Sequence, residues 1–185
     1  SDAKMPYKLI QQRPDLLRIE TTLFGFKAIQ TYDGTAAWML TPTQGLKAVK
    51  TDARDMEFIA AATSIDGPFA YNKDGKYTLK YLGRDEYQGQ PAEVVAWTAS
   101  EERLKYYVNP STWLVDAVRY EYKKNGGWYS MEYRIKSYRE YQGAQFPEEI
   151  AALVNGVEMV LLYVNTFKIL EEVDPEQFGE PSYTM

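Results

Sequence analysis

The chain has 185 residues and a formal net charge of −5, with 45% hydrophobic and 25% charged residues, a composition that suits one globular domain with a substantial core. It contains no Cys and no His, which excludes thiolate nucleophiles, catalysis by Ser–His or Cys–His pairs, and the usual zinc, iron and copper sites. Lys and Arg are scattered along the sequence, which argues against nucleic acid as a partner and against a polybasic membrane anchor.

The first part of the sequence predicts four short strands. Leu17, Ile19 and Leu23 alternate with polar residues, the period of a half-buried strand. Asp33-Gly34 predicts a two-residue hairpin turn, because both residue types tolerate positive φ. Pro42 ends the run, since proline removes a backbone donor from the sheet. The predicted strands lie within 5–12, 17–23, 27–32 and 35–41.

One helix is predicted after residues 43–50, which are expected to form a loop or an irregular strand. Thr51 or Asp52 can cap this helix, and acidic side chains in its first turn suit the positive end of the helix dipole. Four residues then recur on one face at helical spacing, namely Met56, Ile59, Ala60 and Thr63. The helix is expected to end near Ser64, and it either plugs one end of a sheet or covers a cavity as a mobile lid.

After a loop at 69–76, the rest of the sequence predicts a β-meander. Residues 128–138 form its clearest strand, in which aromatic and aliphatic side chains alternate with polar ones. Pairs rich in Asn, Gln and Gly separate the strands and mark turns. The predicted strands are 77–82, 92–99, 103–108, 113–123, 128–138, 146–154 and 157–170. Asp174 is expected to cap a short terminal turn that starts at Pro175, and Phe178 is expected to pack onto the body.

The predicted fold class is mainly β. About ten antiparallel strands with one helix do not form a comfortable flat sheet, so they curl into a barrel or half-barrel or split into a sandwich. No linker or repeat divides the chain, which predicts a single domain over residues 1–185. No apolar run is long enough to span a membrane.

Nothing in the sequence predicts an enzyme, a cofactor or a metal site. Three adjacent acidic pairs occur, at Glu101-Glu102, Glu148-Glu149 and Glu171-Glu172, but neighbours on a strand point to opposite faces and make poor acid/base pairs. Aromatic residues make up 15% of the chain, with 16 Tyr, 7 Phe and 4 Trp. Such side chains suit half-buried strands and also the lining of an apolar cavity.

Several short motifs occur in an order that points to one family. They are Arg13-Pro14-Asp15, Asp33-Gly34, Trp38, Pro42, Leu82-Gly83, Tyr107-Val108-Asn109-Pro110, Tyr141-Gln142-Gly143, Phe146-Pro147, Asn165, Asp174-Pro175 and Phe178. In this order and spacing, over roughly residues 7 to 180, the sequence resembles the outer-membrane lipoprotein-sorting proteins, the LolA/LolB-like superfamily.

This resemblance implies a half-open antiparallel β-barrel with a helical lid over an apolar cavity. It also implies a periplasmic or envelope protein, its signal sequence removed, that carries or accepts the acyl chains of lipoproteins or other lipid. By position, Arg13 matches the residue that ties the lid to the barrel mouth, where a guanidinium can reach several helix-end carbonyls. The family usually begins with a helix and further strands, whereas almost nothing precedes Met5. Either these residues were trimmed or the chain is a shortened member.

Two functions follow as expectations. The first is a non-enzymatic carrier of lipidated protein or lipid, in which each buried methylene contributes ~0.8 kcal/mol. The second is a protein-interaction or stress-sensor module of the envelope on the same half-barrel. From alternation, the residues expected to line the acyl-chain cavity are Leu17, Ile19, Trp38, Val95, Trp97, Met131, Tyr133, Met159 and Leu161.

Overall fold

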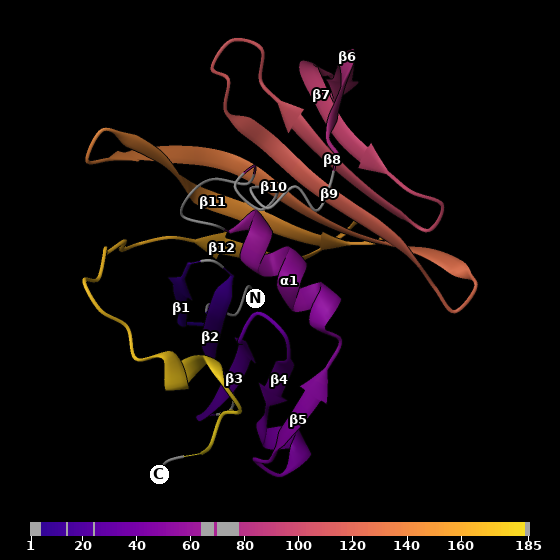
Figure 1. Cartoon of the computed structure of the whole chain (residues 1–185). Helices are drawn as coiled ribbons and strands as arrows, with labels where there is room; N and C mark the ends of the chain where they lie inside the picture. The colour runs from indigo at the N-terminus through magenta and orange to yellow at the C-terminus, as the bar shows by residue number, and fades with distance from the viewer. Residues whose placement is uncertain (1–4, 14, 24, 64–68, 70–77, 184–185) are drawn as a thin grey trace. The chain divides into compact units, whose positions relative to one another are not determined.

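The computed structural model describes residues 5–13, 15–23, 25–63, 69 and 78–183, and in that part the fold is mainly β (Figure 1). The described residues form twelve β-strands and one α-helix. The mainly β fold with a single helix was predicted from the sequence and is confirmed. The end of the helix near Ser64 and most of the loop at 69–76 lie outside the described residues.

The chain divides into two compact units, Ser1–Tyr71 with Ile169–Met185 and Asn72–Lys168. The first contains a five-stranded antiparallel sheet of order β1-β2-β3-β4-β5, and the second a seven-stranded antiparallel sheet of order β12-β11-β10-β9-β8-β7-β6. Within the described residues no strand pairing joins the two sheets, so they do not close into a barrel. That residues 1–185 form a single domain stays a prediction.

The first unit is a short meander of five strands with one helix. Its elements are β1 (Tyr7–Gln12), β2 (Leu16–Leu23), β3 (Phe26–Tyr32), β4 (Ala37–Leu40), a 3₁₀ turn (Pro42–Gln44), β5 (Ala48–Thr51), α1 (Ala53–Ala62) and the 3₁₀ turn η3 (Pro175–Phe178). β5 was predicted only as a loop or irregular strand. It forms because Gly45, at φ 71°, ends the 3₁₀ turn and lets the chain return alongside β4.

Helix α1 packs on one face of the five-stranded sheet. Leu17 pairs with Tyr32, and Tyr32 with Ala37, so these three side chains share a face. Met56 and Ala60 of α1 pack against them in one buried cluster. The helical face predicted from the sequence is therefore confirmed.

The cap of α1 was also predicted. The Asp52 carboxylate accepts a hydrogen bond from the Arg54 backbone N–H at 3.1 Å, which satisfies one of the free donors at the start of the helix. Asp52, rather than Thr51, is thus the capping residue.

The other face of this sheet holds the C-terminal segment. Arg18 donates to the Gln177 carbonyl at 2.9 Å, and the Thr31 hydroxyl to the Gly179 carbonyl at 2.8 Å. Phe178 is fully buried. The Asp174 side chain accepts from the Glu176 N–H, and Pro175 occupies the first turn, as predicted.

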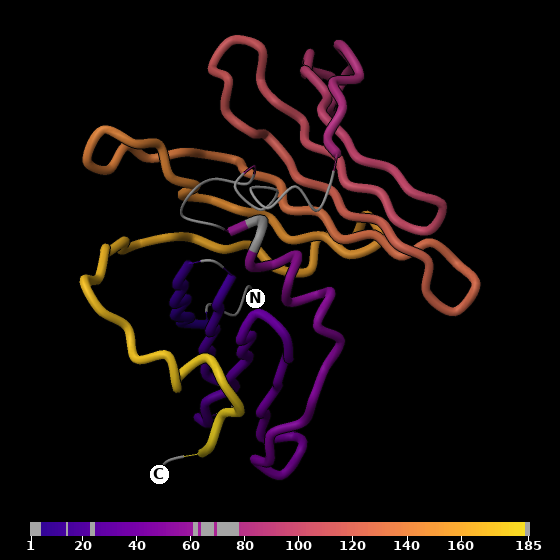
Figure 2. The backbone as a smooth tube through the Cα atoms, viewed as in Figure 1, coloured from indigo at the N-terminus to yellow at the C-terminus, as the bar shows by residue number. Residues whose placement is uncertain are grey.

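The second unit is a meander of seven strands joined mostly by tight turns, which Figure 2 shows as successive reversals of the backbone. Its strands are β6 (Lys80–Tyr87), β7 (Gln90–Thr98), β8 (Glu102–Val108), β9 (Val115–Lys124), β10 (Gly127–Tyr141), β11 (Ala144–Val154) and β12 (Val157–Tyr163). Four turns have positive φ at both central residues, at Gln88-Gly89, Asn125-Gly126, Gln142-Gly143 and Asn155-Gly156. These two-residue turns match the twist of the flanking strands, and each was predicted as a turn.

Several predicted strand boundaries are wrong. β6 runs to Tyr87, although the sequence predicted a strand that ends at 82, and β10 runs to Tyr141 and not to 138. Trp113 belongs to the turn after Asn109-Pro110, with φ 60°, and its N–H donates to the Asn109 carbonyl. At the other end of the unit, β12 ends at Tyr163 and not at residue 170. Beyond the end of β12, the ring of Phe167 packs on Phe146, with centroids 4.3 Å apart.

Candidate functional site

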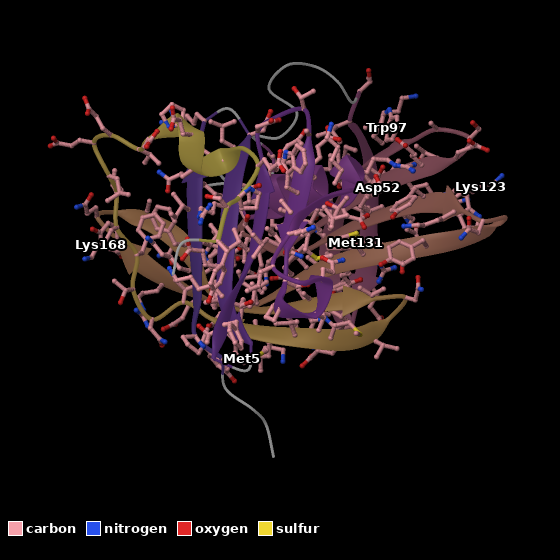
Figure 3. The ribbon with its side chains drawn as sticks, turned by 90° about the horizontal axis from the view of Figure 1, so that it is seen from below. Met5, Asp52, Trp97, Lys123, Met131 and Lys168 are labelled. Carbon is pink, nitrogen blue, oxygen red and sulfur yellow. The ribbon has the colours of Figure 1, made fainter. Side chains whose placement is uncertain are left out.

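One face of the seven-stranded sheet is lined by apolar and aromatic side chains across its whole width. Strand pairing places directly opposed residues on the same face, which allows rows to be followed from strand to strand. One row is Tyr81, Val95, Tyr106, Val118, Tyr133, Ala152 and Val160, and the next is Trp97, Leu104, Tyr120, Met131 and Val154. We call this surface the aromatic face. Figure 3 labels two of its members, Trp97 on β7 and Met131 on β10.

Neighbouring rings on the aromatic face are in contact with one another. The ring centroids of Tyr120 and Tyr122 lie 5.3 Å apart, as do those of Tyr122 and Tyr129, a spacing typical of favourable aromatic pairs. Tyr106 and Tyr122 are fully buried, whereas Val95 and Trp97 are half-buried. Many members of the aromatic face are thus buried in the folded chain. Accessible apolar area remains at Tyr81, Val95, Trp97 and Val160.

The predicted cavity residues do not form one surface. Four of the nine lie together on the aromatic face, namely Val95, Trp97, Met131 and Tyr133. Leu161 pairs with Ala151 and points to the opposite face of the same sheet. Met159 lies at a register shift and is 63% exposed. Because of that shift, Val160 lies on the aromatic face, where alternation had predicted Met159 and Leu161.

The three remaining residues belong to the five-stranded sheet. Leu17 and Ile19 pack on the side that α1 covers. Trp38 pairs with Thr31 and therefore lies on the side that η3 covers; its ring faces the ammonium of Lys50 at 5.0 Å. Alternation groups the residues of one strand, but it does not show which side of Trp38's strand shares a face with Leu17 and Ile19.

A partly buried network of charged residues occupies the opposite face of the seven-stranded sheet. Glu132 accepts a hydrogen bond from the Tyr87 hydroxyl at 2.6 Å and from Arg119 Nε at 2.6 Å. Arg134 Nη2 donates to the same carboxylate at 3.1 Å, and Arg134 Nε donates to the Tyr87 oxygen at 3.0 Å. The Tyr87 ring stacks on Tyr107, with centroids 4.5 Å apart. We call these five residues the Glu132 network.

The network fixes the protonation states of its members. Burial raises the pKa of Glu132, but hydrogen bonds from Tyr87 and Arg119 and the charges of Arg119 and Arg134 outweigh it and leave the pKa below its ordinary value. Burial, together with the hydrogen bond to Glu132, raises the pKa of the Tyr87 hydroxyl. At neutral pH the carboxylate is therefore charged and the phenol keeps its proton.

The Glu132 network exists only because the sheet is strongly bent. Tyr87 is on β6, four strands away from Glu132 on β10. The strand pairing also places it about six residues from Glu132 along the strand direction. In a flat sheet that displacement would be roughly 27 Å, far more than the two side chains can span. The tip of the β6–β7 hairpin must therefore curl over the sheet. A register shift at Gly83, where φ is 97°, provides a bend in β6.

Comparison with known structures bears on the fold. A crystal structure described as an outer membrane lipoprotein-sorting protein domain from Vibrio parahaemolyticus is similar, with a TM-score of 0.50 at 12% identity, over 89% of this chain and 78% of that one. The chain has a LolA-like fold. A DUF1329 family protein from Desulfovibrio piger ATCC 29098 gives a TM-score of 0.47 at 12% identity, over 88% and 77% of the two chains. No protein family and no curated protein matches the sequence.

In the first unit, the end of α1 is tied to β1 by Gln11. Gln11 Nε2 donates to the Thr63 hydroxyl at 2.7 Å and to the Ala60 carbonyl at 3.3 Å. The Thr63 hydroxyl donates in turn to the Ile59 carbonyl at 2.7 Å. Gln11 thus satisfies part of the carboxyl end of the helix, a role that the sequence had not indicated. Arg13, the residue expected to hold a lid, is exposed just after β1.

Two kinds of feature are absent from the residues that the structure describes. Among them, no helix has both the length and the apolar character needed to cross a membrane. They also contain no group of three or more acidic side chains placed to hold a metal ion.

Proposed function

We propose that this protein is a non-enzymatic carrier or acceptor of lipoproteins or lipids in the bacterial cell envelope. The observation that carries the proposal is the aromatic face, which runs across all seven strands of the larger sheet. The LolA-like fold supports it, because a solved structure of that fold is described as a lipoprotein-sorting domain.

The proposed mechanism is the reversible burial of acyl chains against part of the aromatic face. Val95 and Trp97 of β7 are half-buried members of this face and offer accessible contact area, whereas Met131 and Tyr133 lie three strands away on β10 and are buried. Each methylene removed from water contributes ~0.8 kcal/mol. Eight buried methylenes would then contribute roughly 6 kcal/mol, enough to hold a lipid while still allowing its release.

Purified protein is expected to carry extractable lipid. The measurement is organic extraction of the full chain after expression in a Gram-negative host, followed by mass spectrometry of the extract. The matched control is a protein of similar size that binds no lipid, purified in the same way. Repeated absence of both co-purified lipid and exchange with added fatty acid would contradict the carrier proposal.

Arg13→Leu and Gln11→Leu are expected to have separable effects. We propose that Arg13 acts at the mouth of the cavity, so Arg13→Leu should change the rate of lipid transfer to vesicles without changing stability. Gln11→Leu should lower the free energy of unfolding by about 1 kcal/mol, because the contacts of Gln11 with Ala60 and Thr63 are lost. Transfer by Arg13→Leu at the wild-type rate would remove Arg13 from the mechanism.

A further inference from the structure

The two edge strands of the seven-stranded sheet differ in how they are protected. β6 reads KYLGRDEY, with four charged residues and a register shift at Gly83. Charges and irregular backbone are the usual devices that stop an edge strand from pairing with another chain. β12 reads VEMVLLY and has a single charged residue. β12 has a register shift of its own at Met159, but residues 160–163 lie beyond it and carry no charge, so this part of the edge lacks most of the protection that β6 has.

The side chains of β12 remain accessible in the folded chain. Val157, Met159, Val160 and Tyr163 are 61%, 63%, 47% and 51% exposed. The one charge, on Glu158, lies 3.5 Å from the ammonium of Lys136. The strand is thus an exposed apolar ribbon whose single carboxylate already has a counter-ion.

The backbone of β12 also has a free side. The Val164 N–H donates to the Glu148 carbonyl of the neighbouring segment at 2.8 Å, so residues at even positions from 160 to 164 direct their amide groups toward β11. Leu161 and Tyr163 then direct theirs away from it. Within the described residues β12 pairs with β11 alone, which leaves this row of donors and acceptors available to another strand.

We propose that a second copy of this chain pairs with β12 across a two-fold axis, as an antiparallel strand. With Leu161 opposite its own symmetry mate, Met159 opposes Tyr163 and Val160 opposes Leu162. Every one of these pairs is apolar, and the two copies of Glu158 stay apart, so no like charges meet. The assembly stops at a dimer, since each copy uses the same strand for the contact. It would join two seven-stranded sheets into one.

The expected dimer is weak. A single strand pair buries less than the ~1,200 Å² that stable interfaces reach, and so the dissociation constant should lie between about 10 µM and about 1 mM. Sedimentation equilibrium of the full chain over that range tests this. The weight-average mass should rise from 21.3 kDa toward twice that value.

Three variants identify the surface. Val160→Lys places a charge in the apolar ribbon, and Leu161→Pro removes an outward-facing donor without removing a hydrogen bond to β11. Both are expected to stay monomeric at every concentration. The matched control is Leu82→Lys, at an exposed position of the opposite edge strand, which should dimerise like the wild type. Circular dichroism checks that each variant folds.

Other outcomes would overturn the proposal. A wild-type chain that stays at 21.3 kDa up to 1 mM would show that β12 does not pair with itself. Dimers that survive both β12 substitutions, or that disappear in Leu82→Lys, would place the contact elsewhere. Binding of an extended apolar peptide to β12 in a chain that never dimerises would give the edge a different occupant.

Discussion

Glu132→Gln is expected to lower the free energy of unfolding by about 2–4 kcal/mol, since removing one partner of a buried ion pair leaves the other charges uncompensated. The Glu132 carboxylate is 7% exposed, and it is the acceptor for Tyr87, Arg119 and Arg134. A neutral amide accepts fewer of these hydrogen bonds and balances neither guanidinium. The loss should stay below that of a fully buried pair, because the side chains of Arg119 and Arg134 are 35% and 24% exposed.

The same substitution should change how stability depends on pH. The folded-state pKa of Glu132 lies below its ordinary value, so its contribution is fully present above the unfolded pKa near ~4.3 and is lost as pH falls through the folded pKa. The difference between wild type and Glu132→Gln should therefore be largest at neutral pH and shrink below about pH 4. Urea unfolding at several pH values measures it.

Hydrogen exchange provides a readout specific to the bent sheet. Since the Tyr87–Glu132 contact holds the tip of the β6–β7 hairpin over the sheet, Glu132→Gln should speed amide exchange around Gln88 and Gly89. The matched control is Glu140→Gln, at an exposed position of the same strand β10. If the two variants had equal unfolding free energies and equal exchange rates, the Glu132 network would have no structural role.

The sequence allowed the meander to be predicted because its turns carry local signals. Asn125-Gly126 and Asn155-Gly156 adopt positive φ at both positions, and residue types that tolerate this conformation are recognisable without tertiary information. β5 was predicted only as a loop or an irregular strand, for the opposite reason. It has only four residues, Ala48–Thr51, and its pairing with β4 follows from the 3₁₀ turn before it.

Faces and long-range contacts could not be predicted in the same way. Alternation groups the residues of one strand, but only the register shows that Trp38 and Leu17 lie on opposite sides of their sheet. Glu132 and Arg134 resemble any solvated face of a strand, and Tyr87 lies 45 residues before Glu132. Their contact depends on the bend of the whole sheet, which no short pattern encodes.

One of the four predicted residues that share the aromatic face, Trp97, allows a direct test of lipid binding. Trp97→Ala is expected to weaken binding of a fluorescently labelled 16-carbon fatty acid about tenfold, equivalent to about 1.4 kcal/mol. Trp97 is a half-buried member of the aromatic face, and the substitution removes most of the apolar area that its indole offers to an acyl chain. Fluorescence titration measures the dissociation constants.

Trp128→Ala is the matched control, because it removes the same side chain from the other face of the same sheet. Trp128 pairs with Lys123, is 42% exposed, and has the Arg103 guanidinium 4.1 Å from its ring centroid. Its replacement should leave fatty-acid affinity unchanged, since its indole faces charged side chains and not the aromatic face. Equal weakening in both variants would point to a general loss of structure, which urea unfolding would reveal. Weakening in Trp128→Ala alone would place the lipid on the opposite face and contradict the proposed role of the aromatic face.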